Sequence, residues 1–508
     1  MSLPLPIQNA LNRVHNKIQN KGGIHVLHSS EISRSDRVIL TQTRWLEEIL
    51  QGWYMVVRPD LPPGESTSWY ANFWDFIEIY LEHHYGKEYC FSAEYSLDLH
   101  LGKFAVPKQI TVIAKKGSGK PIGLPYETSL LVYSDPSRLP VEQHTIRGIQ
   151  VMPFAYALCR VSPTYFLLHP REAEIALQSI NDSSDLIRTI IQNNFKTAAG
   201  RLIGAYRFLN NEQMATQIKN SLLSVGILVT EENPFKHEIA LIQGEGFKSP
   251  YVARIHSMWA EFRPFVIAHF PSSTGLSNNS EKYLAKVSEL YSQDAYNSLS
   301  IEGYKVTQEL LNRVKNNDWN PDFNKEDRQQ RDALAARGYY EAFQEVKNSI
   351  NQIFEGQVPG LVFQQDLAGW YQKLFAPSAR LGIISPTDLF GYRRHQVYIR
   401  NSRHTPPPKE HLLELMNALF ECLKNEKHPA VRAVLGHFIF VYIHPYMDGN
   451  GRLGRFLMNL MFASGGYPWT IIHVEHRNEY ISSLESASVD GDIIPFTKFV
   501  LSEMKGAY

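Results

Sequence analysis

The sequence has few cysteines, no net charge and no long apolar run. Its 508 residues include three cysteines, and 51 basic side chains balance 51 acidic ones. The cysteines lie far apart and match neither a metal-binding spacing nor a disulfide framework, which predicts a reducing compartment such as the cytoplasm. Zero net charge excludes a strong global attraction to nucleic acid or to an anionic membrane. The most apolar helical stretch, residues 433–443, is too short to span a bilayer, so we expect a soluble chain with no membrane anchor.

The chain also lacks internal repeats, and its pattern of predicted helices and strands changes along its length. We expect a multidomain protein, because this length predicts two to four domains. Residues 1–130 mix helical and strand patterns, as in Thr41–Leu50, which has helical spacing, and residues 109–124, which predict two strands around a Gly-rich turn. This α+β region is a candidate winged helix. Residues 131–279 predict a mixed, largely helical linking domain, and residues 280–508 predict an all-α domain.

Lys115–Pro121 looks like a phosphate-binding P-loop, but the residues at two positions of that motif exclude this interpretation. That loop needs a glycine five residues before its second glycine and a serine or threonine after its lysine. Those positions hold Ala114 and Pro121. A β-turn is the better interpretation of this segment.

The stretch IHPYMDGNGRLGRF, Ile443–Phe456, concentrates polar chemistry between two apolar runs. Pro445 disfavours helical geometry at the residue before it, so we expect a helix to end near His444. The glycines predict a loop over Pro445–Gly451, and the following residues resume helical spacing. The segment therefore predicts a helix, a loop and a second helix, with His444 fixed at the end of a buried helix.

The loop carries the parts of an anion site. Gly449, Asn450 and Gly451 lie at a helix N-terminus, where free N–H groups favour an anion. Arg452 and Arg455 are three positions apart and share one helix face, where each offers donors suited to phosphate.

A metal ligand and a base accompany the anion site. Asp448 is a candidate ligand for Mg²⁺, and His444 supplies a base with an ordinary pKa of about 6.5. Together these groups predict phosphoryl or nucleotidyl transfer to a hydroxyl group.

Residues 444–455, HPYMDGNGRLGR, resemble the signature of Fic proteins, His-Pro-Phe-x-Asp/Glu-Gly-Asn-Gly-Arg-x-x-Arg. The one departure is Tyr446 in place of the usual phenylalanine. The resemblance implies an all-α Fic core and an Mg²⁺-dependent protein adenylyltransferase, which moves AMP from ATP to a Ser, Thr or Tyr hydroxyl of a target protein.

The resemblance also implies roles for the residues of the signature. His444 would deprotonate the hydroxyl and Asp448 would hold Mg²⁺. The segment from Gly449 to Gly451 would form the anion hole, and Arg452 and Arg455 would hold the outer phosphates.

Two further segments resemble parts of this family. Residues 391–403, within FGYRRHQVYIRNSRHTPPP, resemble the β-hairpin flap beside the active site, which would pair with an extended target segment. SLSIEG, Ser298–Gly303, fits the family's inhibitory pattern at the end of a helix expected over about residues 285–303. The resemblance implies that Glu302 pairs with Arg455 and so competes with the γ-phosphate of ATP.

Several alternatives stay open at the level of sequence. Removal of AMP, or transfer of UMP or phosphocholine, would use the same site, whereas Gly451 and both arginines argue against the related Doc-type kinases. The N-terminal half faintly resembles AbiEi-type winged-helix regulators, which implies a DNA-binding regulator with a Fic domain. A module that selects the target protein fits this half equally well. Whether the chain forms a homo-oligomer is also left open.

Overall fold

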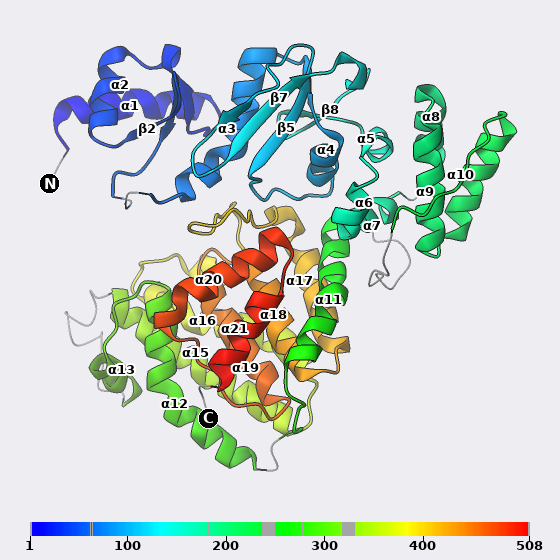
Figure 1. Ribbon diagram of the computed structural model, residues 1–508. Helices are drawn as coiled ribbons and strands as arrows, with labels where there is room; N and C mark the ends of the chain where they lie inside the picture. The colour runs from blue at the N-terminus through cyan, green and yellow to red at the C-terminus, as the bar shows by residue number, and fades with distance from the viewer. Residues whose placement is uncertain are drawn as a thin grey trace. The chain divides into compact units, whose positions relative to one another are not determined.

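The chain forms two compact units. The structure is a computed structural model that describes residues 3–60, 62, 64–180, 182–235, 249–276, 279–316 and 331–505. The first unit comprises Met1–Ile239 together with Tyr398–Thr405, and the second comprises Ala240–Val397 and Pro406–Tyr508. Figure 1 shows the elements of both units in chain order from blue to red. The short segment Tyr398–Thr405 therefore belongs to a different unit from the residues on either side of it.

The first unit begins with a small sheet and its helices. The elements are α1 (Leu5–Asn20), β1 (Val26–His28), the 3₁₀ helix η1 (Ser29–Glu31), α2 (Arg34–Gln42), β2 (Leu46–Leu50) and β3 (Trp53–Val56). The three strands are antiparallel in the order β1-β3-β2, with Val26 opposite Met55. Apolar side chains of α1, including Val14 and Ile18, pack with Leu27 and Leu40 in one core.

The helical spacing of Thr41–Leu50 gave a wrong prediction. Helix α2 ends at Gln42, and Arg44 has a positive φ of 60° that breaks the helical path. The residues from Leu46 onward pair with β3 as strand β2. Pairing with a neighbouring strand thus overrides a short run of helical spacing, as tertiary context often does.

A second sheet follows in the same unit. Its strands are β4 (Tyr89–Phe91), β5 (Gln109–Ala114), β6 (Pro121–Gly123) and β7 (Ser129–Ser134), in the order β4-β5-β7-β6. Helix α3 (Thr67–Tyr85) and helix α4 (Ala93–His100) accompany this sheet, and β8 (His144–Ile146) pairs with β9 (Ile149–Val151). The prediction of two strands within residues 109–124 is confirmed, but β7 lies between them. Pro121 begins a strand rather than a helix, so the exclusion of a P-loop is confirmed.

Helices complete the first unit. They are α5 (Phe154–Arg160), α6 (Tyr165–Leu168), α7 (Pro170–Gln178), α8 (Ser184–Asn193), α9 (Lys196–Phe208) and α10 (Glu212–Ser224), with the 3₁₀ helix η2 (Pro136–Arg138) before them.

Among its described residues, the second unit contains helices and connecting segments but no strand. Its longer helices are α11 (Pro250–His269), α12 (Ser280–Ile301), α13 (Gln308–Lys315), α15 (Arg331–Phe354), α16 (Pro359–Arg380), α17 (Leu412–Asn425), α18 (Pro429–Ile443), α19 (Asn450–Ala463), α20 (Arg477–Glu485) and α21 (Ile494–Lys505). Its short helices are η3 (Pro386–Leu389), η4 (Lys409–His411), η5 (Val474–His476) and the π-helix η6 (Ser486–Asp490). Helix α12 begins a few residues before the inhibitory helix expected over about 285–303.

Helix α18 lies at the centre of the second unit. It packs against α11, α17, α19 and α21, and Figure 1 shows these helices gathered around it. Every residue from Ala430 to Phe440 is buried, as expected for a helix that is apolar on nearly all sides. The last turn of α18 therefore has a rigid support. Within the described ranges, no helix combines the length and the apolar character needed to cross a membrane.

The expected β-hairpin over residues 391–403 is not confirmed, because the structure gives this segment no strand. Its tip forms hydrogen bonds within the first unit instead of across a hairpin. Asn401 accepts from the Ser66 N–H through Oδ1 at 3.1 Å, and its own N–H donates to Thr67 Oγ1 at 2.9 Å. The Val106 N–H donates to the Arg403 carbonyl at 2.8 Å. Three prolines, residues 406–408, then follow and offer no N–H for a strand ladder.

Helices α15 and α16 approach closely at a glycine. A Cβ atom added at Gly338 would lie 2.0 Å from the carbonyl oxygen of Leu374 and 2.7 Å from its carbon. These are backbone atoms of the facing helix, so they cannot rotate away. Gly369, in the interior of α16, has open space at the same position.

We predict opposite effects on stability from Gly338→Ala and Gly369→Ala. The first substitution forces α15 away from α16 and should lower the free energy of unfolding by about 1–3 kcal/mol. The second removes backbone freedom from the unfolded chain at no steric cost and should raise it by about 0.5–1 kcal/mol. Urea unfolding of both variants measures the difference. Equal stabilities would contradict the close approach at Gly338.

Candidate active site

The predicted helix–loop–helix is present in the second unit. Helix α18 ends at Ile443, and His444 follows in the left-handed region with φ 52° and ψ 59°. Gly449, with φ 86°, precedes the first residue of α19. The second helix thus begins at Asn450, slightly earlier than the sequence indicated. His444 and the N-terminus of α19 lie at the two ends of one short loop.

The loop is closed by the side chain of Asn450. Its Oδ1 accepts a hydrogen bond from the Tyr446 N–H at 3.0 Å, and its Nδ2 donates to the Tyr446 carbonyl at 2.9 Å. Both side-chain groups are therefore used within the loop. Asn450 fixes the loop, and only its backbone N–H is left for the anion site that the family resemblance assigns to it.

Neighbouring groups orient the His444 ring and its backbone. Nδ1 lies 3.2 Å from the carbonyl of Val441, which favours the tautomer with a proton on Nδ1 and a free lone pair on Nε2. The Arg393 Nε donates to the His444 carbonyl at 2.9 Å, and the Arg393 N–H donates to the Pro445 carbonyl at 2.8 Å. Burial lowers the pKa of His444 to about 4, so the imidazole is neutral at physiological pH. A neutral ring with its free nitrogen held in place can accept a proton.

Arg452 is buried beside the loop, with an exposed fraction of 1%. Its guanidinium lies over two aromatic rings, 5.2 Å from the centroid of Tyr304 and 5.0 Å from that of Phe375. Its Nη2 is 3.1 Å from Asp448 Oδ1, and Asp448 is about half exposed. Oδ1 of Asp448 also accepts from the Gly449 N–H at 2.6 Å. The half-exposed carboxylate of Asp448 thus lies beside the buried guanidinium of Arg452.

Arg455 is held by the end of helix α12. Its Nε donates to Ser298 Oγ at 2.9 Å, and its Nη2 donates to the Ser298 carbonyl at 3.0 Å and to Glu302 Oε1 at 2.7 Å. Burial opposes the charge on Arg455, but the Glu302 carboxylate outweighs this and raises the pKa of the guanidinium. The predicted pairing of Glu302 with Arg455 is therefore present in the structure.

Two guanidinium nitrogens of these arginines have unsatisfied donors. Nε of Arg452 and Nη1 of Arg455 are buried and form neither a hydrogen bond nor an ion pair within the described part of the chain. A buried donor without a partner costs about 1–3 kcal/mol. Donors of two arginines left free beside a helix N-terminus are suited to an anion with several oxygens, such as a polyphosphate.

Two glycines bring the Glu302 carboxylate to this place. Gly303 has a φ of 87° and ends helix α12 directly after Glu302, and only a glycine adopts this conformation without strain. A Cβ at Gly451 would lie 2.2 Å from Glu302 Oε1, so a side chain there would displace the carboxylate. Gly303 and Gly451 thus both allow the Glu302 carboxylate to reach Arg455.

Several residues that support this site were not predicted from the sequence. Asp294 lies two turns before Glu302 on α12 and accepts from Tyr339 Oη at 2.6 Å and from Trp469 Nε1 at 3.1 Å. Burial raises the pKa of Asp294 to about 6. The spacing of Asp294, Ser298 and Glu302, four residues each, could have marked one helix face. Arg393 and Phe375 come from distant segments and carried no signal of their own.

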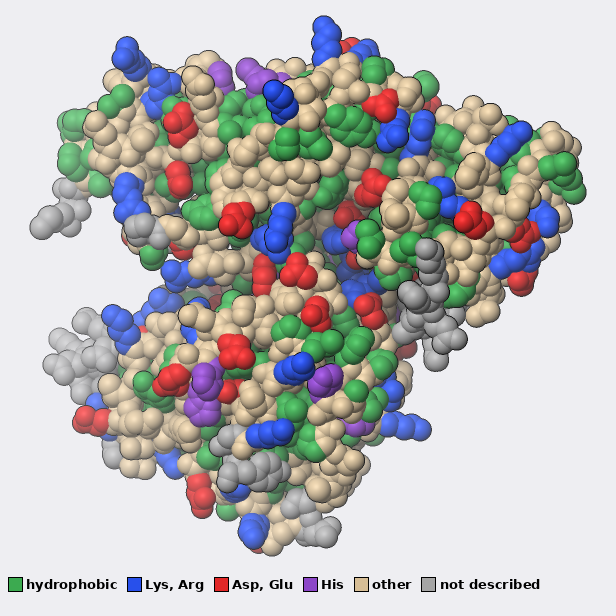
Figure 2. Space-filling model, viewed as in Figure 1, with side chains coloured by type: hydrophobic (Ala, Val, Ile, Leu, Met, Phe, Trp, Pro, Cys, Tyr) green, Lys and Arg blue, Asp and Glu red, His purple; other side chains and the backbone are tan. Residues whose placement is uncertain are grey.

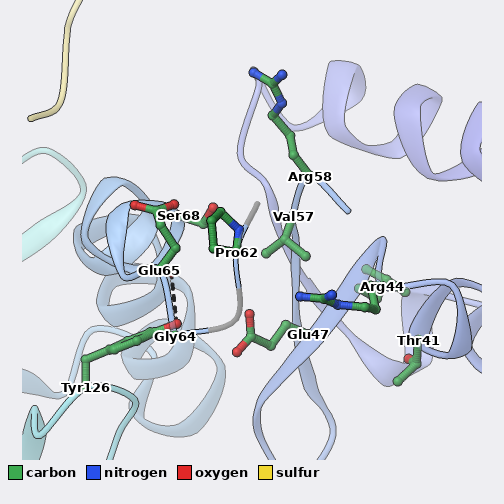
Figure 3. A pocket seen from close by; sticks show the side chains of 11 residues that line it. Thr41, Arg44, Glu47, Val57, Arg58, Pro62, Gly64, Glu65, Ser68 and Tyr126 are labelled. Atoms are coloured by element: carbon green, nitrogen blue, oxygen red, sulfur yellow. Dashed lines mark hydrogen bonds between the residues drawn. The ribbon is translucent and has the colours of Figure 1, made fainter. Parts of the chain in front are cut away.

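The first unit contains a separate pocket of about 260 Å³. Figure 3 shows Arg44 and Glu47 among its side chains and Tyr126 bonded through Oη to the Glu65 carbonyl, at 2.9 Å. Its lining mixes both charge signs and includes no histidine or cysteine. It therefore offers no imidazole base and no thiol nucleophile.

Comparisons with known proteins point to one family. Residues 364–462 match the model of the Fic/DOC family, and this range includes the whole loop from His444 to Arg455 but not Ser298–Gly303. A protein adenylyltransferase Fic from Aedes aegypti is 42% identical over 125 residues, which cover 24% of each chain. A protein of the same name from Nematostella vectensis is 41% identical over 124 residues, 24% of this chain and 28% of that one. The match thus spans about a quarter of the length of these curated relatives.

Solved structures show weaker overall similarity. Fic-1 (residues 134–508) from C. elegans aligns with a TM-score of 0.37 and 17% identity, covering 66% of this chain and 85% of that one. A Fic domain containing signaling protein from Bacteroides thetaiotaomicron aligns with a TM-score of 0.33 and 18% identity, covering 51% and 93%. TM-scores this low do not establish a common overall fold.

We predict that the His444 ring titrates near pH 4. Burial disfavours the imidazolium, so the ring should stay neutral as the pH falls through about 6.5, where an exposed histidine takes up its proton. Long-range ¹H–¹⁵N NMR spectra recorded between pH 3 and 8 follow the protonation, and the spectrum of His444→Gln identifies the signal. A midpoint near 6.5 would show a solvated ring and would remove the physical basis for a neutral base at this position.

Proposed function

Because residues 364–462 match the model of the Fic/DOC family, we propose that this chain is a protein adenylyltransferase that uses ATP to modify a hydroxyl group of a target protein. The observation that carries the proposal is the pairing of a neutral, oriented His444 with buried arginine donors across one loop. The relatives that share this domain are named protein adenylyltransferases. A base and a polyphosphate cradle on a rigid support are the groups that nucleotidyl transfer requires.

Each residue has a defined part in the proposed reaction. The target oxygen attacks the α-phosphorus of ATP, its proton passes to Nε2 of His444, and the bond to pyrophosphate breaks. The N–H groups at the start of α19 and the free donors of Arg452 and Arg455 neutralise the departing phosphates. His444 needs no deprotonation before it acts, because its pKa lies well below neutral pH.

Asp448 is the residue that would hold Mg²⁺. Its Oδ1 is engaged by the Gly449 N–H and by Arg452, while the side chain is about half exposed. A single accessible carboxylate suits Mg²⁺, which keeps several waters and takes its remaining ligands from phosphates. The bound ion would neutralise phosphate charge during transfer.

The position of Glu302 supports the proposal that the enzyme is autoinhibited. Its carboxylate occupies the Nη2 donor of Arg455 that the γ-phosphate would use. ATP bound beside an occupied Arg455 would hold its α-phosphate out of line, and a displacement of about 1 Å lowers a rate by about a hundredfold. In the alternative activity, removal of AMP, the same carboxylate would orient the attacking water.

The first unit suggests a second candidate function, DNA binding. A helix followed by a strand hairpin is the arrangement of a winged helix, and α2, β2 and β3 follow one another in this way. The exposed positions of α2 include Arg34, Ser35, Thr41 and Gln42, which suit contacts with phosphates. On the face drawn in Figure 2, basic and acidic side chains are interspersed, which favours a weak, local contact over a broad basic surface.

We predict that Glu302→Ala increases incorporation of AMP by at least about tenfold, because Arg455 is freed for the γ-phosphate. Protein is incubated with ATP and Mg²⁺, alone and with cell lysate, and intact-mass and peptide spectra locate the adduct. The matched control is Glu289→Ala, an exposed glutamate on the same helix, which should behave as wild type.

A second substitution tests the chemistry itself. His444→Ala in the Glu302→Ala background should remove the adduct while ATP binding, measured by calorimetry, changes little. An adduct with the mass of a single phosphate would exclude adenylyl transfer and indicate a kinase. Adducts of UMP or phosphocholine, when those donors are supplied, would assign a different transferred group to the same site.

We predict that the full chain binds a mixed-sequence DNA duplex weakly and in a salt-dependent manner. Raising KCl from about 50 to 200 mM should reduce the affinity at least tenfold, because counterions compete for the phosphates. Fluorescence anisotropy of a labelled duplex measures this. Arg34→Glu should weaken binding. If the chain does not bind DNA, or if its affinity does not change with salt, the winged-helix region is not a DNA-binding element.

A further inference from the structure

Two histidines and a glutamate converge outside the residues assigned to transfer. His473 and His476 belong to the segment around η5, and Glu503 lies in helix α21. One ring nitrogen of each histidine and a carboxylate oxygen of Glu503 all lie within 4.8 Å of one another. Helix packing thus brings residues from two parts of the second unit to one point.

The spacing of these atoms is close to that of a tetrahedral metal site. His473 Nδ1 is 3.0 Å from Oε2 of Glu503, and His476 Nδ1 is 2.7 Å from Oε1. Zinc bonds of about 2.0–2.2 Å to nitrogen and oxygen place neighbouring ligands roughly 3.4 Å apart. Small rotations of the two rings bridge the difference, and the partial exposure of both histidines leaves the fourth position open to water.

The charge of Glu503 also favours a cation here. The residue is 5% exposed, and among the described residues no lysine or arginine forms an ion pair with it. Its carboxylate accepts from the His473 N–H at 2.7 Å and lies within hydrogen-bonding distance of Nδ1 of both rings. A buried carboxylate is costly without a positive partner, and a divalent cation would supply one.

The surroundings orient the candidate ligands. The backbone N–H of His473 fixes the carboxylate, and Nε2 of the same ring lies 3.4 Å from Nε2 of Gln293 on α12. With Nδ1 on a metal, the ring carries its proton on Nε2, and rotation of the Gln293 amide presents an oxygen to it. Such outer hydrogen bonds commonly fix the histidine ligands of metal sites.

The segment that carries both histidines also holds the end of helix α12. The Val474 N–H donates to Asn297 Oδ1 at 2.9 Å, and Arg477 Nε donates to the Ile301 carbonyl at 2.8 Å. Asn297 and Ile301 directly precede Ser298 and Glu302, the two residues that bind Arg455. A metal ion that makes this segment more rigid would therefore also stabilise the last turns of α12.

We propose that His473, His476 and Glu503 bind a zinc-class divalent ion, and that this ion steadies the η5 segment against helix α12. Two imidazole nitrogens and one carboxylate oxygen form a ligand set that binds zinc in preference to Mg²⁺ or Ca²⁺, which favour oxygen ligands alone. The site needs no nucleotide and no transfer reaction, so it stands or falls independently of the adenylyltransferase assignment.

Calorimetric titration of ZnCl₂ into the chelator-treated full chain near pH 7.5 tests the site. Wild type should show a binding event that His476→Ala and Glu503→Gln each weaken at least tenfold, because each removes one ligand. The matched control is His269→Ala, a histidine near the exposed end of α11 that should leave binding unchanged. Co²⁺ absorption spectra of wild type should show tetrahedral coordination by nitrogen and oxygen that the two variants lose.

Hydrogen exchange separates the two parts of the proposal. Zinc should slow exchange of the amides of residues 297–303 in wild type but not in Glu503→Gln. Zinc binding that is identical in wild type and both ligand variants, or absent from wild type, would show that the cluster is only hydrogen-bonded and would overturn the site. Zinc binding with unchanged exchange at α12 would overturn the link to that helix. Unfolding curves of the variants verify that each is folded. Of the two ligand substitutions, His476→Ala should disturb the core least, because His476 is exposed.

Discussion

The structure around the loop depends on the need of one buried cation for an anion. Arg455 is 3% exposed, and an unpaired buried charge destabilises a fold by about 3–5 kcal/mol. Glu302 meets this need in the present structure, and Ser298 fixes the guanidinium in the plane where the carboxylate reaches it. A phosphate could replace the carboxylate by taking over the same Nη2 donor. Under the proposed function, inhibition and nucleotide binding would be two solutions to one electrostatic requirement.

The remainder of the site is arranged before any ligand arrives. Asn450 closes the loop on itself, Arg393 bonds to the carbonyls of His444 and Pro445, and Arg452 rests between two aromatic rings. Little ordering is therefore left for a nucleotide to bring about, which lowers the entropic cost of binding. Activity would then depend on the small movement of one carboxylate at the end of a helix. The η5 segment, bonded to the same helix turns, offers a second place at which that movement can be controlled.

Much of this site could be predicted from the sequence because its determinants are local. Pro445 and the glycines of the loop dictate where one helix stops and the next begins, and the four-residue spacing of Ser298 and Glu302 places both on one face of α12. Contacts set by distant segments could not be predicted. The stacking of Arg452 on Tyr304 and Phe375 and the closure of the loop by Asn450 depend on packing. The helix expected over Thr41–Leu50 and the hairpin expected over residues 391–403 were wrong or unconfirmed, because pairing with remote partners determines the backbone there.

Under the proposed function, Glu302 and the γ-phosphate of ATP compete for Nη2 of Arg455. Crystal structures of wild type and of Glu302→Ala, each with the same non-hydrolysable ATP analogue, show which group holds this donor. We expect that Arg455 stays bonded to Glu302 in wild type and contacts the γ-phosphate only in the variant, with the α-phosphate then in line with Nε2 of His444. A wild-type complex in which Arg455 binds the γ-phosphate while keeping its bond to Glu302 would contradict it.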